Sequence, residues 1–318
     1  MRVNDFEKTM KKKPLISVIS PVYGAQGIVH NLVNQIENSL QEITEEYEVL
    51  LIEDNSPDSS WSEILKVAAN NKKVKGIKLS RNFGQHNAIS AGMEIAIGDY
   101  VVVMDCDLQH NPIYIKEMYK QIQNGNDIVY TRTKTRKHNV FKNIFALLYY
   151  KLLNLISDFN MDPNIGNFSM LSRRVVAAFN QYNDYKKAYL WVLSWIGFKY
   201  TVLDIEHNER PLGKSSYNLK KIIIHALNVT IANSNKLLYI SIYLGIIVSI
   251  SSLIGGLYLI YNYYSNGALE GWTSLLVIIM FLSGLILITI GITAIYIAKI
   301  YEQTKGRPRY LVSEKINC

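Results

Sequence analysis

Residues 100–110 read Tyr-Val-Val-Val-Met-Asp-Cys-Asp-Leu-Gln-His, an apolar run that turns polar at Asp105. The first five residues are typical of a buried β-strand, and the two carboxylates follow where that strand would end. Asp105 and Asp107 can converge on one hard cation, and an oxygen-rich site that keeps water suits Mg²⁺ or Mn²⁺ bridging a diphosphate. An Asp-x-Asp pair is also common in solvated turns, so the surrounding sequence is needed to distinguish a cation site from a turn.

The sequence on either side of this strand alternates short β-rich runs with helical patterns. We expect strands at residues 15–20, 49–52, 74–79, 100–104 and 128–130, and helices at 27–42, 60–71, 84–97 and 113–124. This alternation predicts an α/β fold with a mostly parallel sheet, which binds ligands at the carboxyl ends of its strands. Polar clusters follow all five strands, at residues 21–23, 53–56, 80–82, 105–109 and 131–132. One such cluster is usually a turn, but five along one edge favour a binding site.

The last third of the chain contains two stretches without a charged residue or histidine, residues 237–260 and 275–297. Each is long enough as a helix to cross a hydrocarbon core of about 30 Å. The connector 261–274 has no Lys or Arg, whereas basic residues lie before the first stretch and after the second. By the positive-inside rule we expect a transmembrane hairpin with the N-terminal domain and both termini in the cytosol.

These patterns divide the chain into four expected parts. They are a cytosolic domain at 1–217, an interfacial amphipathic helix at 218–235, a transmembrane hairpin at 236–298 and a cytosolic tail at 299–318. Residues 140–156 also have apolar side chains at helical spacing. This pattern is compatible with a helix that faces the core and with a helix that lies in the membrane interface.

Composition excludes several other classes of protein. Two cysteines, Cys106 and Cys318, cannot form a disulfide framework and fit a reducing compartment. The net charge of +8 would suit nucleic acid, but no binding motif accompanies it, so we expect lipid and phosphate partners instead. No secretion signal, Gly-x-Gly-x-x-Gly motif, P-loop or His-Glu-x-x-His motif is evident.

The chain resembles, over almost its whole length, the family 2 glycosyltransferases of the GT-A fold. Within them it is similar to the polyprenyl-phosphate glycosyltransferases with a C-terminal transmembrane pair. The resemblance lies in residues 16–23 (ISVISPVY), 53–58 (EDNSPD), 79–86 (LSRNFGQH), 105–109 (DCDLQ) and 210–217 (RPLGKSSY). It implies inverting transfer of one sugar from a nucleotide sugar, with UDP expected, to undecaprenyl phosphate in a bacterial cytoplasmic membrane. The lipid-linked product would feed modification of a cell-surface glycan.

The resemblance also implies roles for individual residues. Three would hold the base and ribose of the nucleotide: Pro21, Tyr23 and Asp54. Three would organise Mg²⁺ or Mn²⁺ and the diphosphate: Asp105, Asp107 and Gln109. Cys106 would line the same site, and Asp107 would also count as catalytic. Three cations would clamp phosphates of donor or acceptor: Arg132, Arg210 and Lys214. The fork-shaped guanidinium groups of the two arginines suit this task. Arg210 would act in catalysis as well.

The chain departs from the family pattern at residues 166–169. Many relatives have Gly-Asp-Phe-Arg there, whereas this chain reads Gly-Asn-Phe-Ser, so an amide replaces a carboxylate proposed as catalytic in relatives. Asn167 can orient a substrate but cannot accept a proton, and Asp162 or Asp158 is the alternative. A phosphate acceptor is already anionic near neutral pH, so it needs a general base less than a sugar hydroxyl does.

Two other functions stay open at this point. One is a nonprocessive glycosyltransferase that acts on a lipid-linked saccharide, although its hydroxyl acceptor would need a base. The other is a catalytically silent membrane scaffold that binds a nucleotide sugar. The small membrane anchor is also compatible with a homo-oligomer, since some relatives form tetramers.

Overall fold

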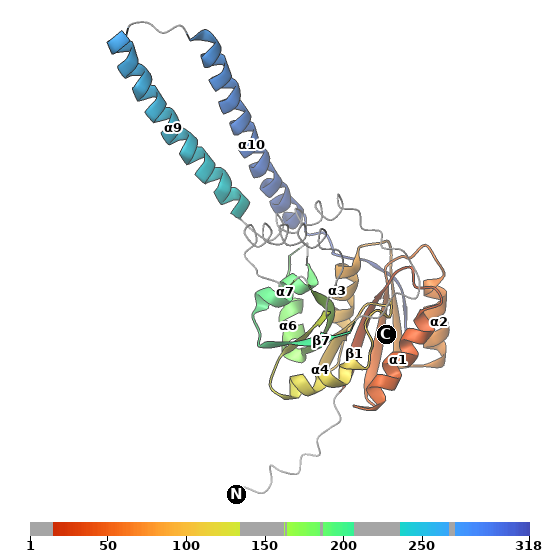
Figure 1. Ribbon diagram of the computed structural model, residues 1–318. Helices are drawn as coiled ribbons and strands as arrows, with labels where there is room; N and C mark the ends of the chain where they lie inside the picture. The colour runs from red at the N-terminus through yellow and green to blue at the C-terminus, as the bar shows by residue number, and fades with distance from the viewer. Residues whose placement is uncertain (1–14, 134–161, 163, 185–186, 207–235, 267–270) are drawn as a thin grey trace, which may run out of the picture. The chain divides into compact units, whose positions relative to one another are not determined.

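The computed structural model describes residues 15–133, 162, 164–184, 187–206, 236–266 and 271–318. These residues form an α/β body and a separate pair of long helices (Figure 1). The expected helices at 140–156 and 218–235 lie outside the described residues.

The α/β body contains one sheet with the strand order β7-β5-β6-β4-β1-β2-β3-β8. The strands are β1 (Ile16–Val22), β2 (Tyr47–Glu53), β3 (Val74–Leu79), β4 (Tyr100–Val103), β5 (Ile128–Thr133), β6 (Ile165–Ser172), β7 (Tyr200–Ile205) and β8 (Val312–Ile316). The five strands and four helices expected from the sequence are confirmed to within a few residues at each end. β6 runs antiparallel between β4 and β5, and β8 runs antiparallel to β3, so the sheet is mixed but mostly parallel.

Helices cover both faces of this sheet. On one face lie α1 (Val29–Gln41), α2 (Ser60–Asn70) and α4 (Tyr114–Gln123), and on the other lie α3 (Gln85–Ile95), α6 (Arg173–Gln181) and α7 (Tyr189–Ile196). All seven residues of β1 are buried, as expected for a central strand covered on both faces. α1 turns one apolar stripe to the core, including Leu32, Ile36 and Leu40. Each such buried side chain contributes about 1.5–3 kcal/mol.

The strand order reverses at β1. The chain passes from β1 through α1 to β2 on one side, and returns from β3 through α3 to β4 on the other side of β1. In open α/β sheets, ligands bind outside the carboxyl ends of the strands at such a reversal. The topology therefore directs attention to the loops after β1 and β4.

The C-terminal residues join the sheet as its edge strand. The sequence-based division treated 299–318 as a tail apart from the 1–217 domain, whereas the structure groups Arg307–Cys318 with the α/β body. β8 has the sequence VSEKI and is largely exposed, so its sequence lacks the alternation of apolar and polar residues that would predict a strand. A boundary drawn at residue 217 thus leaves out one strand of the sheet.

The helix pair consists of α9 (Lys236–Asn266) and α10 (Trp272–Thr304), which contact each other. Their apolar stretches, Ser241–Tyr258 and Phe281–Thr304, have mean hydropathies of 1.7 and 2.2 and are long enough to cross a membrane. Large apolar side chains such as Leu253 and Leu287 are 67% and 68% exposed. Because water disfavours an apolar surface of this extent, the pair indicates membrane association.

Candidate functional site

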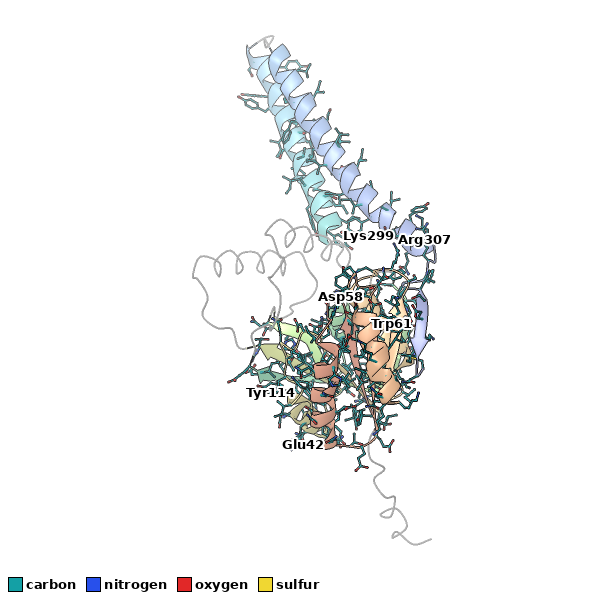
Figure 2. All side chains as sticks on the ribbon, turned by 90° about the vertical axis from the view of Figure 1, so that its right-hand side faces the viewer. Glu42, Asp58, Trp61, Tyr114, Lys299 and Arg307 are labelled. Carbon is teal, nitrogen blue, oxygen red and sulfur yellow. The ribbon has the colours of Figure 1, made fainter. Side chains whose placement is uncertain are left out.

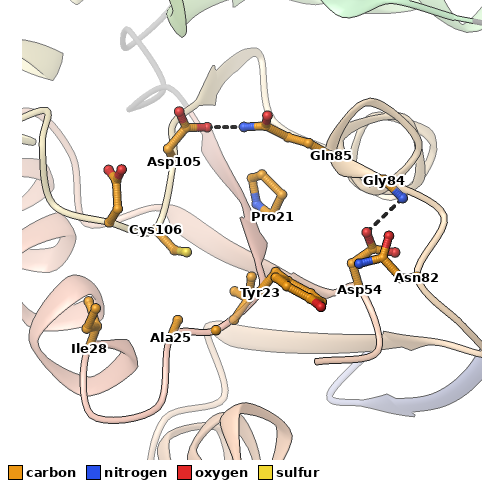
Figure 3. Close-up of a pocket in the computed structure, with 13 residues that line it drawn as sticks. Pro21, Tyr23, Ala25, Ile28, Asp54, Asn82, Gly84, Gln85, Asp105 and Cys106 are labelled. Atoms are coloured by element: carbon orange, nitrogen blue, oxygen red, sulfur yellow. Dashed lines mark hydrogen bonds between the residues drawn. The ribbon is translucent and has the colours of Figure 1, made fainter. Parts of the chain in front are cut away.

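A pocket of about 410 Å³ opens at the carboxyl ends of β1, β2, β3 and β4 (Figure 3). Its volume lies in the range of small-molecule sites. The lining residues are Pro21, Val22, Tyr23, Gly24, Ala25, Ile28, Asp54, Asn82, Gly84, Gln85, Asp105, Cys106 and Asp107. The pocket therefore brings together six residues that the sequence assigned to a nucleotide-sugar site: Pro21, Tyr23, Asp54, Asp105, Cys106 and Asp107.

Asp54 both lines the pocket and shapes one of its loops. It is 3% exposed and accepts hydrogen bonds from the backbone N–H groups of Phe83, at 2.7 Å, and Gly84, at 2.8 Å. Burial raises the pKa of Asp54, and these two hydrogen bonds oppose that effect. Gly84 has φ +91°, a left-handed conformation that favours glycine, at the residue before α3. Each carboxylate oxygen keeps a second lone pair for a ligand.

Asp105 and Asp107 follow β4 in a tight turn. The Gln85 amide donates to Asp105 Oδ1 at 2.5 Å, and the backbone N–H of Gln109 donates to Asp107 Oδ1 at 3.2 Å. Leu108, the residue after Asp107, has φ +58°, a left-handed backbone conformation that is uncommon for residues other than glycine. Such conformations cost about 1–3 kcal/mol and concentrate at functional sites. The turn thus sets two carboxylates on the wall of one pocket.

Cys106 lies between these two carboxylates. Burial, followed by the negative charges of Asp105 and Asp107, raises the pKa of its thiol to about 11. The sulfur is directed toward the loop that carries Tyr23 and Ala25 (Figure 3). At neutral pH this thiol is therefore protonated and uncharged.

The loop after β1 is held by residues just before α2 and at its first position. The N–H of Ala25 donates to Ser60 Oγ at 3.0 Å, and the N–H of Gln26 donates to Asp58 Oδ2 at 3.0 Å. Asp58 also accepts hydrogen bonds from the hydroxyls of Ser56 and Ser60. Although burial alone would raise it, these hydrogen bonds hold the pKa of Asp58 at about 2. The wall opposite α3 is therefore fixed by neutral donors around an ionised carboxylate.

The structure places the predicted residues on β5 and β6 differently. Arg132 forms ion pairs with Asp162, at 3.3 Å, and Asp204, at 2.7 Å, and none of the three lines the pocket. Burial would raise the pKa of Asp162, but hydrogen bonds from Asn164 and Arg132 lower it overall, which makes Asp162 a poor proton acceptor. Asn167 lies on β6, and it does not line the pocket.

Four other predicted positions need separate mention. The side chain of Gln109 does not line the pocket, although its backbone N–H orients Asp107. Arg210 and Lys214 lie outside the described residues, as does Asp158. Their roles stay predictions.

Sequence reasoning gave no role to Asn82 and Gln85, which both line the pocket. Both stand in the segment 79–86, which carried part of the family resemblance. Asn82 lies in the short loop after β3 and Gln85 begins α3, so their position after a strand was the available signal.

The pocket also fits a divalent cation. Within the ranges that the structure describes, no group of three or more His, Cys, Asp and Glu side chains gathers around a common point. Asp105 and Asp107 supply two carboxylates to one wall. That donor set suits Mg²⁺ or Mn²⁺, which commonly take one or two protein carboxylates and complete their shell with water and substrate phosphates.

Comparison with known proteins gives consistent matches. The family described as "Glycosyl transferase family 2" matches residues 17–179. The bactoprenol glucosyl transferase of Shigella phage SfX is 32% identical over 94% of this chain and 99% of its own. A prophage bactoprenol glucosyl transferase homolog from Escherichia coli K12 is 31% identical over 93% and 98%, and the Bacillus subtilis glycosyltransferase YkcC is 32% identical over 94% and 93%.

Solved structures give a more distant match. Glucosyl-3-phosphoglycerate synthase from Mycobacterium tuberculosis is 14% identical, with a TM-score of 0.49 over 69% of this chain and 77% of that chain. This likeness is too remote to transfer a ligand or a residue's role.

Proposed function

Because the chain belongs to glycosyltransferase family 2, we propose that it transfers one sugar from a nucleotide sugar, expected to be a UDP-sugar, to undecaprenyl phosphate in a bacterial cytoplasmic membrane. Relatives named for bactoprenol, the undecaprenyl alcohol, align with 93–94% of this chain. The unaligned residues are fewer than those of either long helix, so the alignment includes residues from both helices. The observation that carries the donor half of the proposal is the pocket that gathers Asp54, Asp105 and Asp107.

The pocket offers a suitable surface to each part of a nucleotide. Tyr23 is 53% exposed at the rim, where its ring can stack on a base. The free lone pairs of Asp54 can accept hydrogen bonds from a base or ribose. The diphosphate then lies toward the two carboxylates after β4, which requires a cation between them.

Asp105 and Asp107 would hold that Mg²⁺ or Mn²⁺, and Gln109 is the third predicted contributor. When bound, the metal supplies charge neutralisation to the leaving nucleoside diphosphate. The Gln85 amide keeps Asp105 in place, and the turn at Leu108 does the same for Asp107. These residues therefore bind and orient the donor without themselves exchanging a proton.

In the proposed reaction, an oxygen of the lipid phosphate attacks the anomeric carbon of the sugar. The bond from that carbon to the diphosphate oxygen breaks, its electron pair leaves with the nucleoside diphosphate, and the configuration inverts. The attacking oxygen is already anionic, so the amide at Asn167 and the lowered pKa of Asp162 do not obstruct the step. Placement of the two substrates supplies most of the acceleration.

The membrane arrangement forms part of the proposal. Lys and Arg flank the apolar stretches at their outer ends and are absent from the connector, so the α/β body and both termini would lie in the cytosol. Cys318 is exposed and can report this side. A membrane-impermeant maleimide should label it in inverted vesicles, and labelling in intact spheroplasts instead would reverse the topology.

Purified full-length protein with radiolabelled UDP-sugars, Mn²⁺ and undecaprenyl phosphate provides the direct test. A chloroform-extractable sugar product supports the proposal, and undecaprenol without phosphate is the matched control acceptor. Product only from a lipid-linked saccharide would favour the nonprocessive alternative. Nucleotide binding with no product from any acceptor would favour the silent scaffold.

A further inference from the structure

The residues after α10 form a strap along the edge of the sheet, defined here as residues 309–317. Its strand β8 pairs with β3 from Gly76, opposite Ile316, to Leu79, opposite Val312. A Cβ atom on Gly76 would lie 2.8 Å from the Ile316 side chain and 2.6 Å from Ile64, so the strap packs closely only because this residue is glycine. The strap is therefore fitted to this edge.

Side chains anchor the far end of the strap. Glu314 accepts hydrogen bonds from Lys78, at 3.1 Å, and from the Trp61 indole, at 3.0 Å. Figure 2 shows Trp61 on α2, at the side of the body where β8 lies. The Asn317 amide donates to the carbonyls of Ala68, at 2.7 Å, and Val74, at 2.8 Å. These bonds reach α2 and β3, so two neighbouring elements hold the strap.

The near end of the strap holds the segment that lines the pocket. The carbonyl of Leu311 accepts the N–H of Ser80, the first residue after β3, at 2.8 Å. On α3, Glu94 accepts hydrogen bonds from Arg309, at 3.0 Å, and from the Tyr310 hydroxyl, at 2.6 Å.

Between these two attachment points lie the three pocket residues of the β3–α3 segment: Asn82, Gly84 and Gln85. Asp54 holds the middle of the same segment through Phe83 and Gly84. Its start is attached to the strap, and so is the helix that follows it. A loop that is already ordered binds its ligand more tightly, because no conformational entropy of the loop is lost on binding.

We propose that the strap is a positioning element for the donor nucleotide: the end of the chain, beyond the second apolar helix, holds the β3–α3 segment in its binding conformation. This inference rests on the proposed function, because the nucleotide is the ligand whose binding the strap strengthens. It also implies that a soluble fragment ending at residue 217 lacks part of its donor-binding machinery.

The first test removes the near-end anchors in the full-length protein, in the double variant Arg309→Gln/Tyr310→Phe. We expect the Kd for UDP with Mn²⁺ and the KM for the donor to rise about fivefold, with kcat within about twofold, because only pre-ordering is lost. Lys315→Gln, on the same strap but outside the anchors, should leave both constants unchanged. Tyr310→Phe alone removes one hydroxyl and serves should the double variant fail to fold.

The second test uses reciprocity, since a nucleotide that is favoured by the strap must itself stabilise the strap. UDP with Mn²⁺ should slow amide hydrogen exchange at Ser80 and along β8 in the wild-type protein, and less so in the double variant. Unchanged UDP affinity in the double variant, or protection of the pocket loops without β8, would overturn the strap proposal alone. A wild-type protein that binds no nucleotide would overturn this proposal and the proposed function together.

Discussion

Charged side chains have different partners in the two halves of the sheet edge at the carboxyl ends of the parallel strands. Beside β1 and β4, carboxylates are held by neutral N–H donors: Asp54 by two backbone amides, and Asp105 by Gln85. Beside β5 and β7, Arg132 is held between Asp162 and Asp204. An ion pair satisfies both charges within the protein, whereas a carboxylate held by neutral donors keeps its negative charge for a ligand. The first half is therefore suited to bind a cation, and the second to hold strands together.

The strongest test of this comparison makes the same substitution in both halves. Asp107→Asn should lower kcat by about a thousandfold or more, because it removes a charge that neutralises the metal and diphosphate. Asp204→Asn should keep kcat within about threefold, because it loses only a partly exposed ion pair. Transfer assays and thermal unfolding of both variants measure the difference. Full activity in Asp107→Asn would remove the metal role and with it the comparison.

Asp54→Asn should have the next largest effect. The amide group must turn its NH₂ toward Phe83 or Gly84, so one part-buried backbone N–H loses its acceptor, at a cost of about 1–2 kcal/mol in stability. We expect the donor KM to rise about tenfold as the loop loses order. Asp99→Asn is the matched control, since Asp99 also accepts a backbone N–H, that of Leu15, away from the pocket. A donor KM that rises equally in both variants would count against a local role.

The first half of this edge was predictable from the sequence because its signals are local. The run 100–110 contains both the strand and the carboxylates that follow it. In the same way, Pro21 stands at the end of β1 and Asp54 directly after β2. Once the sheet is recognised as mostly parallel, the ends of β1, β2 and β4 must meet. The fold and the position of the binding edge followed from that step, whereas the roles of the six pocket residues came from the family resemblance.

The second half depends on strand register, which the sequence does not display. Arg132 meets Asp204 because β5 and β7 pair in parallel with these two residues opposite each other, 72 positions apart in the chain. As an isolated cation after a strand, Arg132 reads equally well as a phosphate ligand. β8 escaped prediction for a related reason, since a short exposed strand gains its stability from β3 rather than from its own pattern.

Asp58 tests whether neutral donors alone can keep a carboxylate ionised. Its folded pKa of about 2 lies below the ordinary value of 3.8, so it contributes stability above about pH 4 that is lost as the pH falls toward 2. Allowing for its partial exposure, Asp58→Asn should cost about 1–2 kcal/mol at pH 7. Urea unfolding at pH 7 and pH 2.5 measures this cost, which should shrink at the lower pH. A cost that is the same at both values would contradict the assignment.

Arg132→Gln examines the other half directly and should have a smaller effect. Breaking its two partly exposed ion pairs should cost about 0.5–1 kcal/mol, reduced further by salt. The donor KM should stay within about threefold of the wild-type value. Denaturation and donor kinetics at low and high salt provide the measurement. A tenfold loss of donor affinity would instead support the predicted role of Arg132 as a phosphate ligand.

Cys106 should give the smallest effect, because its thiol contributes no charge to the half of the edge that binds a cation. With a thiol pKa of about 11, it is neutral at pH 7.5, and Cys106→Ser replaces one neutral group with another, so activity should change by no more than about twofold. Alkylation by iodoacetamide, followed by mass spectrometry, should be slow at pH 7.5 and should rise about tenfold per pH unit toward 11, as the thiolate fraction grows. Bound UDP should slow it further by covering the pocket, while Cys318 should be unaffected by UDP. A loss of activity above tenfold in Cys106→Ser, with thermal unfolding unchanged, would contradict this neutral role of the thiol and would favour an ionised sulfur as a third charge in the site.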